Sequence, residues 1–235
     1  MSVVKRILCL ANSKKMSGRC VAGREVQNTG PGPWIRPVSA RSTEEVSEDE
    51  RQYQDGSDPR VLDIIDIPLI QHQPHACQTE NWLLDPDYYW TKVSQVGWAE
   101  LQRFVENPAT LWANGRSTYN GANDEILQAN ADVLPNSLVL IRVPALELRV
   151  FAPGVDFGNP KRRVLADFRY RGIQYAFWVT DPVIERDFKA RADGTYTLIE
   201  CCLCVSLGEP KQKQNGESCR YKLVAAVILR EGTRP

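Results

Sequence analysis

The stretch 163–180 reads RVLADFRYRGIQYAFWVT, two apolar runs that meet at Arg171-Gly172. Both runs are rich in aromatic and branched residues, and a glycine at their junction is typical of a tight turn, so the sequence predicts a β-hairpin here. Successive side chains of a strand point to opposite faces. Arg169 and Arg171 should therefore share one face of the hairpin, with Tyr170 on the other.

Similar strand-like runs flank this hairpin. The second half of the chain holds long apolar runs at 137–151, which we expect Pro144 to interrupt, at 195–207 and at 219–230. The first half holds runs at 3–11, 17–26, 34–39 and 61–70, with a polar turn at 12–15 between the first two. Many short strands at short spacing favour a small barrel or a sandwich. The sequence shows no alternation of strands and helices of the kind that would indicate a parallel sheet.

The middle of the chain differs from both halves. It is rich in prolines and tryptophans. Apolar residues at helical spacing predict a short helix over 98–106, and Asn107-Pro108 is typical of the start of a further helix. We expect Trp82, Trp90 and Trp112 to be structural. The predicted fold class is mainly β, with two small β-barrels joined by a helical and aromatic connector. The expected domains are 1–75 for the first β unit, 76–135 for the connector and 136–235 for the second β unit.

Composition narrows the class of protein. Of 235 residues 43% are hydrophobic, enough for a packed core, and no apolar run approaches the roughly 20 residues that span a bilayer. The charged N-terminus does not resemble a signal peptide. Seven cysteines at irregular spacing argue against a disulfide framework. We therefore expect a reduced, cytoplasmic protein without a membrane partner.

The zero net charge hides an uneven distribution. Residues 1–41 hold eight Lys and Arg against one acid, residues 42–130 hold five against sixteen, and residues 131–235 hold sixteen against twelve. Two basic blocks therefore flank an acidic middle. Such asymmetry indicates a localised anion-binding face, and nucleic acid is the commonest large anion.

Several strings together resemble the bacterial dual OB-containing domain family. They are LCLANSKK (8–15), SGRCVAG (17–23), WIRPVS (34–39), QTENW (78–82), VTDP (179–182), VSLGE (205–209) and YKLVAA (221–226). The resemblance covers nearly the whole chain and implies two OB folds. It also implies nucleic-acid binding in prokaryotic defence systems, the role suspected for this family.

OB barrels bind single strands through a basic groove and aromatic side chains on which bases stack. Both residue types occur in each half of the chain, and Trp34 and Arg36 should share one face of their strand because they are two residues apart. The candidate nucleic-acid-binding residues are Lys14, Lys15, Arg19, Trp34, Arg36, Arg162, Arg163, Arg169, Arg171, Trp178 and Lys222. The alternatives are that the tryptophans belong to the core and that the basic hairpin of 163–180 is an edge protected by charge.

Catalytic and metal sites find weaker support. His72, His75 and Cys77 lie close together but lack a second ligand pair at zinc spacing. Asp181, Ser206 and Lys222 could form a reactive cluster, but Asp before Pro usually forms a turn. We expect no catalytic residue, no metal and no cofactor.

The sequence therefore favours a module that binds single-stranded DNA or RNA and acts as a sensor or targeting component, with an effector protein as a further partner. The alternative is a pocket protein for a nucleotide or modified base, or an enzyme, with its site between the two β units.

Overall fold

The computed structural model describes residues 2–230 and divides the chain into two compact units. The first unit runs to Val105 and takes in Pro135–Ser137. The second comprises Glu106–Leu134 and the chain from Leu138 onward. Each unit contains one β-sheet.

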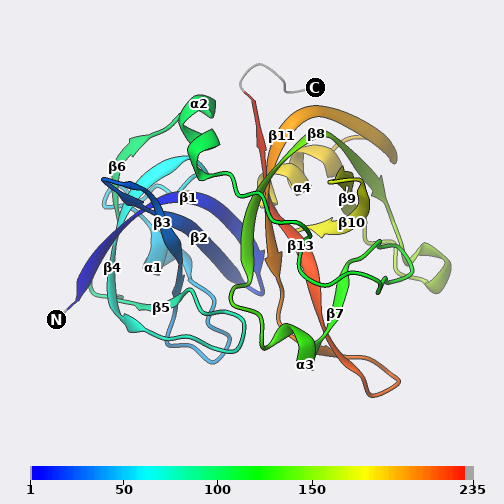
Figure 1. Ribbon diagram of the computed structural model, residues 1–235, viewed down its shortest axis with the longest axis horizontal. Coiled ribbons are helices and arrows are strands. Elements are labelled where there is room, and N and C mark those ends of the chain that lie inside the picture. Colours follow the sequence, from blue (N-terminus) through cyan, green and yellow to red (C-terminus); the bar gives the residue numbers. More distant parts are fainter. Residues whose placement is uncertain (1, 231–235) are drawn as a thin grey trace. The chain divides into compact units, whose positions relative to one another are not determined.

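Five strands of the first unit pair in a ring. β1 pairs with β2, β2 with β3, β3 with β5, β5 with β4, and β4 with β1, all antiparallel except β3 with β5. A ring of this kind is a closed barrel, and it can be followed in Figure 1. The strands are β1 (Val3–Lys15), β2 (Gly18–Gln27), β3 (Gly30–Val38), β4 (Asp63–His72) and β5 (Asn81–Leu84).

Short elements complete the first unit. They are α1 (Glu48–Arg51), β6 (Thr91–Gln95), α2 (Trp98–Leu101) and the 3-10 turn η1 (Gln102–Phe104). β6 pairs with the first half of β4, and η1 packs against β3. The barrel core includes Ile7, Ile35, Ile65 and Trp90, all at most 1% exposed.

The second unit repeats the same ring. β8 pairs with β9, β9 with β10, β10 with β13, β13 with β11, and β11 with β8, all antiparallel except β10 with β13. Both rings thus follow one topology, with the parallel pair joining the third strand to the fifth. The strands are β8 (Leu138–Phe151), β9 (Arg163–Tyr170), β10 (Ile173–Val179), β11 (Gly194–Leu207) and β13 (Ser218–Leu229).

Helix α4 (Pro182–Lys189) connects β10 to β11 in this unit (Figure 1). It begins at Pro182 because Asp181 caps it, accepting hydrogen bonds from the backbone N–H groups of Val183 at 2.9 Å and Ile184 at 3.2 Å. The smaller elements are β7 (Glu125–Leu127), α3 (Gln128–Ala131), η2 (Val155–Phe157) and β12 (Lys211–Gln212).

The mainly β fold class with OB-like barrels is confirmed, but three local expectations were wrong. β1 continues through Lys15, so the first turn lies at Met16-Ser17 and not at 12–15. No helix starts at Asn107-Pro108. Pro144 does not interrupt β8, because β9 begins to pair only at Glu147 and the missing N–H of Pro144 is not needed on that side.

The stretch 76–135, expected as a connector, contributes to both units. Residues up to Val105 supply β5 and β6 to the first unit, whereas Glu106–Leu134 supply β7 and α3 to the second. No helix in the described part of the chain is long and apolar enough to cross a membrane.

Trp90 provides a direct test of the first core. Its side chain is 1% exposed among the apolar residues of the barrel. Trp90→Ala should lower the free energy of unfolding by about 3–5 kcal/mol, the usual effect of removing a large buried aromatic. Urea denaturation measures this change, and Tyr88→Ala, at a residue 60% exposed, is the control. A loss below about 1 kcal/mol would contradict the core assignment.

Candidate nucleic-acid interface

The outer face of β8, β9 and β10 carries the strongest candidate site. On β9 the residues Val164, Ala166, Phe168 and Tyr170 point into the barrel core. Because side chains alternate, the residues between them lie on the outer face. The outward rows comprise Glu147, Arg149 and Phe151 of β8, Arg163, Leu165, Asp167 and Arg169 of β9, and Gln174, Ala176 and Trp178 of β10. Leu165 and Ala176 are nevertheless buried, so the accessible part of this face lies around them.

Arg163 and Trp178 form the centre of this face. The Arg163 guanidinium lies over the indole ring, with its carbon 3.9 Å from the ring centroid. The ring of Phe151 is 5.8 Å from that of Trp178, at an interplanar angle of 33°. All three side chains are half-buried. Burial lowers the pKa of the Arg163 guanidinium, and Glu185 opposes that shift, yet the group stays charged at neutral pH.

The charges around this centre are mixed. Arg149 lies 3.9 Å from Asp167 and 5.8 Å from the Phe151 ring, and Arg169 is exposed. Glu147 lies opposite Asp167 in the β8–β9 register. Desolvation by burial raises the pKa of Asp167, and Gln174 donates a hydrogen bond to it. The face therefore combines stacking groups with a small excess of cations.

Two other predicted residues of this hairpin support the fold. Arg162 donates to the carbonyl oxygens of Lys189 at 2.6 Å and Arg191 at 2.7 Å, and pairs with Asp193. It thus completes the C-terminal end of α4. Arg171 lies exposed in the β9–β10 turn with φ 49° and donates to the Asn107 side chain at 3.2 Å. Arg162 is therefore largely occupied by protein acceptors.

Lys222 was expected on the nucleic-acid surface, but it is only 1% exposed. Its Nζ donates to the carbonyl of Ala113 at 2.6 Å and to the side-chain oxygen of Asn114 at 3.2 Å. The ring centroids of Tyr175 and Phe177 lie within 6 Å. Desolvation by burial lowers the pKa of Lys222 to about 7, with Asp124 opposing the shift. Lys222 thus anchors the 113–114 segment and is shielded from solvent.

The basic residues of the first unit lie partly at the surface. Lys14 and Arg19 face each other across the β1–β2 hairpin, with Lys14 exposed and Arg19 half-buried. Lys15 is also half-buried. Arg19 exchanges two backbone hydrogen bonds of 2.9 Å with Val46, which hold the turn end of the hairpin.

Trp34 and Arg36 share one face of β3 as expected, but they are not on the surface. Trp34 is 7% and Arg36 4% exposed. Arg36 pairs with Glu80 at 2.9 Å and donates to the Ser137 hydroxyl at 2.8 Å, which in turn donates to Glu80 at 2.5 Å. This buried triad uses Arg36 as an internal partner of a carboxylate. The site predicted at Trp34 and Arg36 is therefore corrected to a structural one.

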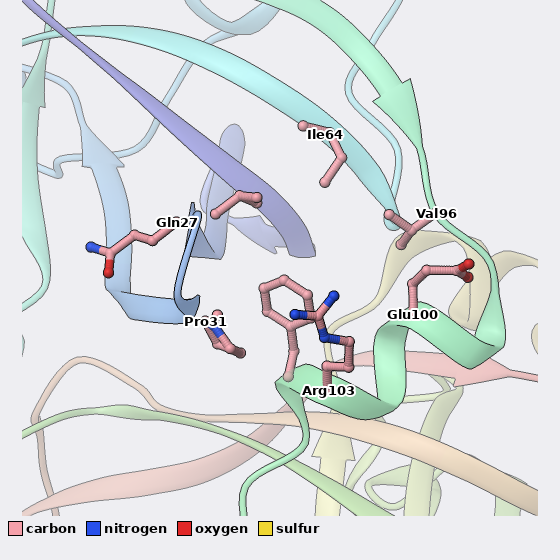
Figure 2. Close-up of a pocket in the computed structure, with 9 residues that line it drawn as sticks. Gln27, Pro31, Ile64, Val96, Glu100 and Arg103 are labelled. Atoms are coloured by element: carbon pink, nitrogen blue, oxygen red, sulfur yellow. The ribbon is translucent and has the colours of Figure 1, made fainter.

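A small hollow also lies in the first unit. It measures about 140 Å³ and is lined by residues of β2, β3 and β4 and by the segment from Val96 to Phe104. Figure 2 shows Gln27 and Pro31 on one side and Val96 and Glu100 on the other. Its lining is mostly apolar, and one Glu100 oxygen accepts the Gly97 N–H at 3.2 Å. The hollow therefore offers volume but few polar groups that could orient a ligand.

The remaining candidates have structural roles. His72 lies 5.1 Å from the Trp82 ring, and its Nε2 is 2.6 Å from the Thr79 carbonyl oxygen. Asp181 caps α4 and also accepts the Val227 N–H at 3.1 Å, and burial raises the pKa of Asp181. Within residues 2–230, no three His, Cys, Asp or Glu side chains are grouped so as to hold a metal ion.

The two repeated rings can now be set beside known proteins. The sequence profile described as the dual OB-containing domain matches residues 5–227. The chain belongs to this family. No curated protein and no solved structure gave a significant match. Membership of this family agrees with the two barrels seen in the structure and extends over nearly the whole chain. It does not assign a role to any residue of the dual OB protein.

Three residues of β8 and the loop after it were not among the predicted site residues of this dual OB protein. They are Arg149, Phe151 and Phe157. Phe151 ends β8, and Phe157 is 88% exposed in the loop that follows. The sequence pattern that could have indicated Phe151 and Phe157 is FAPGVDFGNPKR at 151–162. Its glycines and prolines are typical of a loop, and the stretch contains these two aromatic residues. An aromatic in such a loop has no strand partner to bury it.

The buried triad leads to a stability prediction. Arg36→Ala should lower the free energy of unfolding by about 3–5 kcal/mol, because it leaves the Glu80 carboxylate buried without its cation. The double variant Arg36→Met, Glu80→Met should recover much of this loss, since it removes both charges. Chemical denaturation measures both effects. Full stability of Arg36→Ala would show that the pair is not needed in the fold.

Lys222 predicts a pH dependence. Its pKa falls from 10.5 to about 7 on folding. Between these values the unfolded chain binds more protons, so the free energy of unfolding should rise with pH, by up to about 1.4 kcal/mol per pH unit. Lys222→Met should flatten the rise between pH 7 and 8.5, a window below the ordinary thiol pKa of 9.0. An unchanged slope in Lys222→Met would contradict this origin.

Proposed function

We propose that this dual OB protein binds single-stranded nucleic acid on the outer face of β8, β9 and β10. The stack of Arg163 on Trp178, with Phe151 beside it, carries the proposal. β9 and β10 are the second and third strands of their ring, and OB barrels bind oligonucleotides on that face. Aromatic rings accept stacked bases of any sequence, and arginine contacts phosphates and bases.

The charge pattern makes stacking the main source of affinity. The outward rows carry Arg149, Arg163 and Arg169 against Glu147 and Asp167, and Lys161 adds one exposed cation in the preceding loop. Each stacked base contributes about 1–3 kcal/mol. With about two or three phosphate contacts, log K should fall by only about 1.4–2.1 per log unit of salt.

A role as a sensor or targeting component in prokaryotic defence is the finer part of the proposal. It rests on the family resemblance and on the composition of the proposed site, whose aromatic and arginine side chains suit binding of a strand rather than its cleavage. An effector protein would then act on the bound strand. Deleting the gene from its host and challenging the host with phage tests this role, and equal survival of both strains would count against it.

Trp178→Ala tests the binding site. Loss of the stacking ring should weaken binding of a fluorescent single-stranded oligonucleotide by about fivefold to a hundredfold. Trp178→Phe should keep most of the affinity. The double variant Arg163→Gln, Arg169→Gln should reduce the salt slope. Fluorescence anisotropy at two or more salt concentrations gives both quantities.

Tyr88→Ala is the matched control, since Tyr88 is an exposed aromatic of the other unit. Its affinity should equal that of the wild type. Mass spectrometry of the bound oligonucleotide should recover it unchanged. Undiminished binding by a folded Trp178→Ala protein would refute the site, and recovery of a cleaved or modified strand would favour the enzyme alternative.

A further inference from the structure

Phe157 has an unusual position for a large apolar side chain. It lies in the loop that connects β8 to β9, two strands of the proposed binding face, and is 88% exposed. Val155, two residues earlier, is 58% exposed. Neighbouring exposed apolar side chains that form a patch rimmed by polar residues often mark an interaction site.

The loop holds this side chain outward by its own backbone hydrogen bonds. The Gly154 carbonyl accepts the N–H groups of Phe157 at 3.0 Å and Asn159 at 2.8 Å. Gly158 donates to Val155 at 3.1 Å and adopts φ 73°, a conformation that favours glycine. The ordering of the loop backbone therefore does not depend on burial of Phe157, and the ring remains available to a ligand.

The loop is also continuous with the stacking site. It leaves β8 at Phe151 and enters β9 at Arg163, and these two residues face each other in the strand register. Lys161 is exposed between them, and Asp156 is the one carboxylate of the stretch 152–162. A nucleic acid that lies on Trp178 would therefore extend toward Phe157.

We propose that Phe157 stacks on the terminal base pair of a duplex whose single-stranded tail occupies the Trp178 face. The preferred ligand of the site would then be a junction between single-stranded and double-stranded nucleic acid. Apolar side chains are known to stack against or between base steps, and a terminal pair presents its face without any cost of unstacking. This inference rests on the proposed function, because it needs the tail to bind.

The test compares four DNA probes on the full chain. They are a hairpin duplex with a 3′ tail, the same hairpin with a 5′ tail, the blunt hairpin, and the tail alone. The wild type should bind one tailed hairpin about fivefold or more tighter than the tail alone, the gain expected of one further stacking contact. The blunt hairpin should bind more weakly than that tailed hairpin.

Variants assign this gain to the loop. Phe157→Ala should abolish the advantage of the tailed hairpin and leave the affinity for the tail unchanged. Phe157→Trp should retain the advantage, and Tyr88→Ala should behave as the wild type. The side chain is almost fully exposed, so thermal unfolding of Phe157→Ala should match the wild type.

The outcomes separate the two proposals. If the tail binds but no tailed hairpin binds more tightly, the junction inference is wrong and the single-strand proposal stands. If Phe157→Ala keeps the advantage, Phe157 does not contact the duplex and the inference is wrong. If neither the tail nor any hairpin binds, the proposed function itself fails.

Discussion

The parallel pairing of the third strand with the fifth closes each ring, and the rest of the structure depends on it. In the second unit Trp178 and Val179 of β10 pair with Leu223 and Val224 of β13. Closure removes the exposed edges of a sheet and divides every strand into an inward and an outward row. An inward side chain then joins the barrel core, whereas an outward side chain is exposed or buried according to what covers it.

Lys222 shows how strict this division is. It lies two residues before the core residue Val224 on β13, so it shares the inward row. A lysine buried in that row loses the hydration of its charged form, which lowers its pKa, and its amino group needs hydrogen-bond acceptors within the protein. Its Nζ finds them in two oxygens of the segment 113–114. The cation expected on the binding face is thus used inside the barrel.

The two barrels also repeat one arrangement with different exposure. In each, an arginine of the second strand lies over a tryptophan of the third: Arg24 over Trp34 at 5.8 Å, and Arg163 over Trp178 at 3.9 Å. In the first unit η1 packs against β3, and Trp34 is 7% exposed. Trp178 remains half-buried. An arginine–tryptophan pair between the second and third strands is therefore packed away in one barrel and half-buried in the other.

This difference marks the limit of what the sequence could predict. Local patterns predicted the hairpin at Arg171-Gly172, the long β8 and β11 strands and the shared face of Trp34 and Arg36. They could not predict that Glu80, 44 residues after Arg36 in the chain, would lie 2.9 Å from it. Exposure depends on such distant partners. Sequence patterns singled out Arg163, Arg169 and Trp178 as candidates. They lie on one outer face because β9 and β10, the two strands of the predicted hairpin, are neighbours in the chain.

The covering of Trp178 by Arg163 is compatible with the proposed binding of a base. A cation over an aromatic ring at a partly exposed site contributes about 0.5–1 kcal/mol, whereas a stacked base contributes about 1–3 kcal/mol. A base can therefore displace the guanidinium with a net gain. With the proposed ligand bound, Arg163 would keep its charge and could pair with a phosphate of the strand. In the free protein the same stack limits the exposure of the indole ring, so one arginine serves both states of the site.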